Sequence, residues 1–77
     1  MDREYRYWAW LSEGEHSVDA AREIIRTWQD PRGLEKEESH TPDGWRTTWT
    51  YQDVRDQHKR GHLLPITAEV AEQRTRS

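Results

Sequence analysis

The hydrophobic pattern of the chain begins with residues 5–11, YRYWAWL, which hold four of its eight aromatic residues. Aromatic and small apolar residues in alternation favour a β-strand, in which successive side chains point to opposite faces. The two faces would carry Tyr5, Tyr7, Ala9 and Leu11 on one side and Arg6, Trp8 and Trp10 on the other. Because both sets are largely apolar, we expect this strand to lie inside a sheet that is covered on both sides.

A helical spacing follows the first strand. Ser17 is a suitable N-cap, and Asp19 would lie in the first turn, near the positive end of the helix dipole. Apolar residues then recur at the i, i+3, i+4, i+7 positions Val18, Ala21, Ile24, Ile25 and Trp28. This stripe predicts a helix over residues 18–28, which Pro31 would end.

Two further segments are typical of a β-hairpin. Residues 34–40 and 45–51 flank the sequence TPDG at 41–44, whose Pro and Gly suit a tight turn. The second segment, WRTTWTY, is rich in strand-forming residues. The first contains the charged run EKEE at 35–38, so we expect it to be an edge strand, where charges discourage unwanted pairing.

The last third of the chain is less regular. A short helix is expected from Gln52 until Gly61, followed by the apolar run LLPI at 63–66. Thr67 would cap a helical stretch over residues 68–73, and residues 72–77 would form a frayed tail. The sequence therefore predicts a single α+β domain, residues 1–77, in the order β-α-β-β-α: a three-stranded antiparallel sheet, one helix packed on a face, and an irregular helical C-terminus.

Composition adds limits to this picture. Hydrophobic residues make up only 31% of the 77 residues and charged residues 35%, so the aromatic side chains must supply much of the core. With no cysteine, no signal-peptide pattern and no apolar run of about 20 residues, we expect a cytoplasmic protein without a membrane span. The net charge is −3, with an acidic first half and a mildly basic second half.

Candidate catalytic and metal-binding groups are weak. His58 and His62 have an i, i+4 spacing that His40 could complete as a zinc site, but Gly61 interrupts the helix between them, so surface histidines are the preferred interpretation. Ser17 beside His16 is better explained as a helix cap than as a nucleophile. We therefore predict no enzymatic activity, no metal, no cofactor and no small-molecule substrate.

The aromatic strand carries the functional hypothesis. If the predicted helix covers only one face of the sheet, Trp8 and Trp10 lie on the other, where residues 63–66 either fold over them or leave at least one exposed. Exposed Trp and Arg dominate protein interfaces. We therefore predict a small protein-binding module, an inhibitor or adaptor that occludes a surface of a larger protein or pairs with a second copy of itself. The predicted binding residues are Arg6, Trp8, Trp10, Arg46 and Thr48.

The competing hypothesis is a nucleic-acid-binding module that uses the more basic second half of the chain. Its phosphate-binding residues would be Arg55, Lys59, Arg60, Arg74 and Arg76. The acidic balance of the first half disfavours general adhesion to a phosphate backbone. We therefore rank this hypothesis second.

Overall fold

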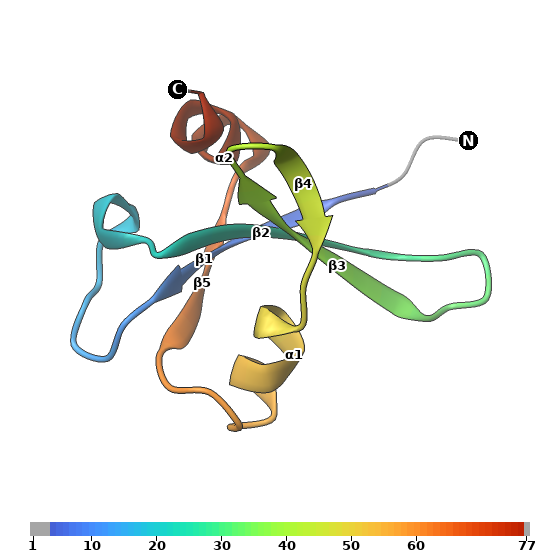
Figure 1. Ribbon diagram of the computed structural model, residues 1–77, viewed down its shortest axis with the longest axis horizontal. Coiled ribbons are helices and arrows are strands. Elements are labelled where there is room, and N and C mark those ends of the chain that lie inside the picture. Colours follow the sequence, from blue (N-terminus) through green and yellow to red (C-terminus); the bar gives the residue numbers. More distant parts are fainter. Residues whose placement is uncertain (1–3, 77) are drawn as a thin grey trace.

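The computed structural model describes residues 4–76, which form a five-stranded sheet, two α-helices and one 3₁₀ helix (Figure 1). The strands are β1 (Arg6–Leu11), β2 (Glu23–Gln29), β3 (Glu35–Thr41), β4 (Gly44–Thr47) and β5 (His62–Ile66). The helices are the 3₁₀ helix η1 (Val18–Ala20), α1 (Thr50–Arg55) and α2 (Ala68–Thr75). The chain is therefore a small α+β domain, but with more strands than the three that were expected.

The strands are all antiparallel to their neighbours, in the order β4-β3-β2-β1-β5. The first four follow one another as a meander, and β5 returns to pair with the free side of β1. The prediction that residues 5–11 form an inner strand is confirmed, because β1 pairs with β2 on one side and with β5 on the other.

One side of the sheet, which we call the Ala9 face, holds the main hydrophobic cluster. Ala9 and Leu11 of β1 and Ile24 of β2 are buried there, and α2 contributes the buried Ala71. Val18 of η1 packs against the margin of this cluster. The C-terminal helix, not a helix over residues 18–28, therefore covers this face.

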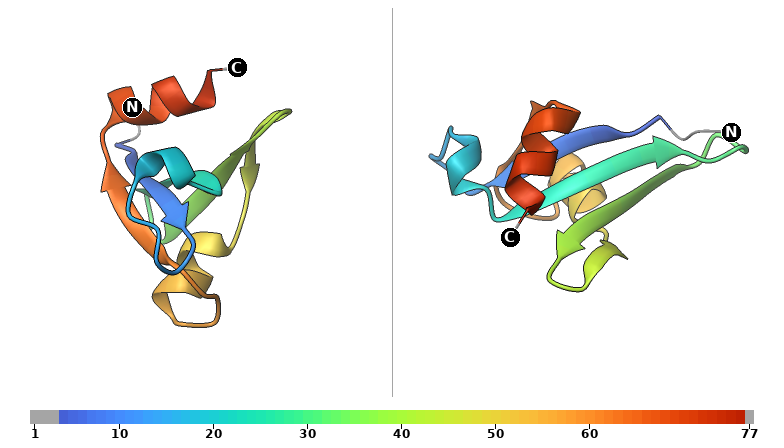
Figure 2. Two further views of the ribbon diagram at one scale, coloured as in Figure 1. Left: turned by 90° about the vertical axis from the view of Figure 1, so that its left-hand side faces the viewer. Right: turned by 90° about the horizontal axis from the view of Figure 1, so that it is seen from above.

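The opposite side, which we call the Trp8 face, is covered by α1. Trp8 lies opposite Ile25 in the register between β1 and β2, so the two side chains share this face. Ile25 is fully buried. Figures 1 and 2 show α1 and α2 at opposite ends of the molecule with the sheet between them. Both faces of β1 are thus covered from within the same chain.

The predicted helix over residues 18–28 is wrong. Ser17 does cap a helix, its Oγ accepting the N–H of Asp19, but that helix is the single 3₁₀ turn η1. From Glu23 onward the backbone is the strand β2. Two adjacent β-branched residues, Ile24 and Ile25, favour a strand, and each is buried on a different face.

The predicted hairpin exists, but the first of its strands is not an edge. β3 pairs with β2 as well as with β4. Its charged residues find partners in the fold: Glu38 forms an ion pair with Arg26 at 2.7 Å, and Glu37 accepts hydrogen bonds from α1. Because those partners are distant in sequence, the charged run at 35–38 was interpreted as part of a solvent-exposed edge strand.

The second strand of the hairpin is shorter than expected. β4 ends at Thr47, and α1 begins at Thr50 instead of Gln52. The carboxylate of Glu37 accepts the backbone N–H groups of Tyr51 and Gln52 at 2.8 and 3.0 Å. This tertiary cap satisfies the first turn of the helix and draws residues 50 and 51 out of the strand.

The C-terminal third also differs from the prediction. The apolar run at 63–66 belongs to β5, which lies beside β1 in the sheet and does not fold over Trp8 and Trp10. Thr67 caps α2 as predicted, its Oγ1 accepting the N–H of Val70 at 3.1 Å. Residues 72–75, expected to fray, are helical, and Ser77 lies outside the described residues.

Candidate functional site

The five predicted protein-binding residues do not form one patch. Arg6, Trp8 and Trp10 alternate along β1 on the Trp8 face. Arg46 belongs to β4, and Thr48 follows that strand. Because β2 and β3 lie between β1 and β4, the two groups are separated by three strand spacings, about 14 Å.

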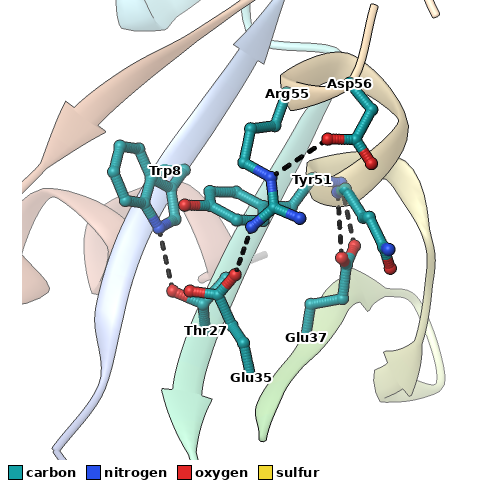
Figure 3. A network of polar contacts seen from close by, with 8 residues as sticks. Trp8, Thr27, Glu35, Glu37, Tyr51, Arg55 and Asp56 are labelled. Atoms are coloured by element: carbon teal, nitrogen blue, oxygen red, sulfur yellow. Dashed lines mark hydrogen bonds and ion pairs between the residues drawn. The ribbon is translucent and has the colours of Figure 1, made fainter. Parts of the chain in front are cut away.

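Trp8 is engaged in the interior of the domain. Its Nε1 donates a hydrogen bond to Oγ1 of the buried Thr27 at 3.0 Å. Its ring lies 5.2 Å, centroid to centroid, from that of Tyr51 on α1, and Figure 3 shows Arg55 beside the same tyrosine. We therefore assign Trp8 to the core that holds α1 in place.

The polar contacts around α1 fix the helix on the Trp8 face (Figure 3). Arg55 bonds to Glu35 of β3 at 3.0 Å and to its neighbour Asp56 at 3.4 Å. Burial raises the pKa of Glu37, the carboxyl that caps the helix, and burial also raises the pKa of Tyr51. Glu37 thus holds the first turn of α1, and Tyr51 packs the helix against Trp8 of the sheet.

Trp10 lies in a different environment, at the base of a surface groove with a volume of about 350 Å³. We call it the Trp10 groove, and it is lined by Trp10, Ser12, Glu13, Arg22, Lys59 and Arg60. Lys59 Nζ lies 4.6 Å from the centroid of the indole, and the guanidinium carbon of Arg22 lies 5.6 Å from it. Two cations therefore contact one aromatic ring.

Residues 56–61, the loop after α1, are fixed to the floor of the Trp10 groove. Trp10 Nε1 donates to the backbone carbonyl of Arg60 at 3.0 Å. A Cβ atom at Gly61 would lie 2.3 Å from the backbone oxygen of Leu11, so only glycine permits this approach. Gln57 has a positive φ of 64°, which is uncommon for a residue with a side chain. The loop is thus held in one specific conformation.

The cations of the groove have no acidic partners in the described chain. Ion pairs among residues 4–76 involve Arg26, Arg32, Arg55, Arg74 and Arg76, but not Arg22, Lys59 or Arg60. Arg22 is instead positioned by a hydrogen bond from its Nη1 to Ser12 Oγ at 3.3 Å. The groove therefore holds three cationic residues that form no ion pair within the described chain, with Glu13 in the same lining.

The residues predicted to bind nucleic acid are divided between the two ends of the molecule. Lys59 and Arg60 line the Trp10 groove. Arg74 and Arg76 belong to the α2 region, where they pair with Asp19 and Glu72. The fold thus joins only two of the five residues in one site.

The histidines do not assemble as the zinc hypothesis requires. The rings of His62 and His16 have centroids 6.0 Å apart, and His40 packs against Trp45. In the part of the chain that the structure describes, no three His, Asp or Glu side chains gather where a metal ion could bind. No helix there is long and apolar enough to cross a bilayer.

Two residues of interest were missed by the sequence analysis. Arg22 falls inside the predicted helix over residues 18–28 but outside its apolar stripe, so its approach with Lys59 to Trp10 could not be anticipated. Trp49 was placed inside a strand beside Trp45, whereas 67% of its surface is exposed at the start of α1. The most exposed indole among the described residues is therefore that of Trp49, and Trp8 and Trp10 are partly buried.

Comparison with known proteins found no relative of this chain. No family model matches the sequence, and no curated protein or solved structure matches it either.

Proposed function

We propose that this chain is a small, non-enzymatic protein-binding module whose binding surface is the Trp10 groove. The observation that carries the proposal is the pair of cations, Arg22 and Lys59, over one partly buried indole, with Arg60 in the same lining. None of the three forms an ion pair among residues 4–76. Trp and Arg are the residues that contribute most to protein interfaces. In the cell such a module would act as an inhibitor or adaptor that occludes a surface of its partner.

The contacts that fix the loop after α1 support a binding role. Ordering flexible side chains and loops on association reduces affinity, whereas a loop fixed in advance avoids that cost. Here the hydrogen bond from Trp10 to Arg60 and the close approach of Gly61 hold the loop before any partner arrives. His58, Lys59 and Arg60 are exposed on it.

The positions of the ionisable groups support a role without catalysis. An active site needs groups of shifted pKa within a cleft where a substrate binds. Glu37 and Tyr51 have raised pKa values, but their environment is the contact between the sheet and α1, and neither lines the Trp10 groove. The carboxylate of Glu37 is already occupied by two backbone N–H groups.

The test is capture of partners from the source cells with the tagged chain after nuclease treatment. We expect a stoichiometric protein that is retained by the wild type and lost by the triple variant Arg22→Gln, Lys59→Gln, Arg60→Gln. The matched control is Arg74→Gln with Arg76→Gln, which removes two cations near the other end of the molecule. The captured protein is then purified, and its direct binding to each variant is measured by calorimetry.

Two results would refute the proposal. The first is a partner that binds the triple variant as tightly as the wild type, because binding would then not use the groove. The second is recovery of partners only when nucleic acid is left intact, which would favour the nucleic-acid hypothesis.

A further inference from the structure

We infer that the ligand of the Trp10 groove is an acidic, extended stretch of a partner protein, whose carboxylates bind Arg22, Lys59 and Arg60. The inference rests on the proposed function and specifies the chemistry of the partner. Arginine forms paired hydrogen bonds with carboxylates, and lysine attracts them as a point charge. The whole chain has a net charge of −3, whereas the lining of the groove has three cationic residues and one acidic residue.

The arrangement of the cations favours a ligand with several carboxylates. Arg22 reaches the groove from the segment before β2, and Lys59 and Arg60 reach it from the loop after α1. A second hollow, of about 390 Å³, shares Glu13, Lys59 and Arg60 with the groove and continues past Gln57 and His58. The cations are thus spread over two hollows that share lining residues, which suits a stretch of chain that carries several carboxylates.

The indole is poorly placed to stack on a nucleobase. Single-stranded nucleic acids bind to proteins through aromatic faces that are open to successive bases. Here Arg22 and Lys59 already lie over the Trp10 ring, and its Nε1 is bonded to the Arg60 carbonyl. The ring therefore serves to position cations, which favours a peptide over a nucleic acid.

Glu13 gives the groove a point of selectivity. It is the acidic residue that lines both hollows, beside the three cations. A carboxylate of the ligand placed next to Glu13 would be repelled, so the acidic stretch should carry a neutral residue there. Replacing Glu13 by Gln should therefore strengthen the binding of a uniformly acidic peptide, an effect that a purely structural role for Glu13 does not predict.

The experiment titrates the full ¹⁵N-labelled chain with hexaglutamate and, separately, with hexaglutamine, following amide and indole chemical shifts. We expect hexaglutamate to shift the Trp10 indole N–H and the amides of residues 57–61, with weaker binding as salt is raised. The triple variant Arg22→Gln, Lys59→Gln, Arg60→Gln should bind about tenfold more weakly, the combined effect of three exposed ion pairs. The Arg74→Gln, Arg76→Gln control should bind as the wild type does, and Glu13→Gln should bind more tightly.

The outcomes separate this inference from the proposed function. Equal binding of hexaglutamine, or no shifts at the groove with hexaglutamate, overturns the acidic ligand, while groove-dependent capture of a protein would still support a binding module. Hexaglutamate binding without any groove-dependent partner supports the anion chemistry and refutes the proposed function. An oligothymidylate that binds the groove more tightly than hexaglutamate overturns the inference in favour of nucleic acid.

Discussion

Replacing Gly61 by alanine tests whether the close approach at the groove floor stabilises the domain. Gly61 has a φ of +105°, and a Cβ there would lie 2.3 Å from the Leu11 carbonyl oxygen and 2.6 Å from Trp10 Nε1. The matched control is Gly44→Ala, since Gly44 has a φ of +103° with nothing within 4 Å of the added Cβ. Both variants are strained by the positive φ, but only in Gly61→Ala does the added Cβ clash with its surroundings.

The expected difference follows from these contacts. A non-glycine residue in such a conformation costs about 1–3 kcal/mol, which the two variants share. Gly61→Ala must also displace backbone, at about 1–3 kcal/mol, and break the Trp10 to Arg60 hydrogen bond, at about 0.5–1.5 kcal/mol. We therefore expect Gly61→Ala to be about 1.5–4.5 kcal/mol less stable than Gly44→Ala, a large share of the stability of a domain of this size.

The assay is urea unfolding of both variants followed by circular dichroism, together with the position of the Trp10 indole N–H resonance. That resonance should move in Gly61→Ala and stay in place in Gly44→Ala, because only the first change disturbs the Arg60 carbonyl. If the two variants differ by less than about 0.5 kcal/mol in free energy of unfolding, the floor of the groove is not held as described.

Three further substitutions test the interior. Ile25→Ala should lower the free energy of unfolding by about 2–5 kcal/mol, because Ile25 is fully buried; a loss under about 1 kcal/mol in urea would contradict its place in the core. Arg26→Met should cost about 1–3 kcal/mol in the same assay, since the guanidinium lies 4.4 and 4.3 Å from the rings of Tyr5 and Trp45 and pairs with Glu38; full stability with methionine would show that only its apolar stem matters. Burial raises the pKa of Glu37 above its ordinary 4.5, so the folded chain holds this proton more tightly than the unfolded chain. The stability of the wild type relative to Glu37→Gln, measured by urea unfolding, should therefore rise as the pH falls from 7 towards 4.5, and a fall would oppose this assignment.

The sequence predicted the inner strand β1 because its residue types and its alternation agree. β2 was predicted as a helix, although its side chains also alternate: Glu23, Ile25 and Thr27 face one way and Ile24, Arg26 and Trp28 the other. Since both of its faces are covered, apolar residues occur at adjacent positions and also satisfy helical spacing. Local pattern alone cannot separate these two periods, and the partners that decide between them lie in other strands.

The sequence indicated most of the residues of the Trp10 groove, but it did not show that they lie together. Trp10, Lys59 and Arg60 were all singled out, but for two different functions, because nothing in the sequence places residue 10 beside residue 60. That contact depends on β5 pairing with β1 and on Gly61 approaching Leu11. Arg46 and Thr48 were grouped with the residues of β1 because the two strands between β1 and β4 could not be read from the sequence.

The pairing of β5 with β1 also determines when the groove can exist during synthesis of the chain. β1 is made before the other strands of the sheet, but its second neighbour, β5, is the last of the described strands to be made, and the register joins Tyr7 to Ile66. Contacts between such distant residues form slowly, and domains tend to fold only after their last essential segment has emerged from the ribosome. While residues 62–66 are still inside the ribosome, β5 cannot pair with β1, and Lys59 and Arg60 have no fixed position beside Trp10. The proposed binding at the groove therefore requires that residues 62–66 have already left the ribosome.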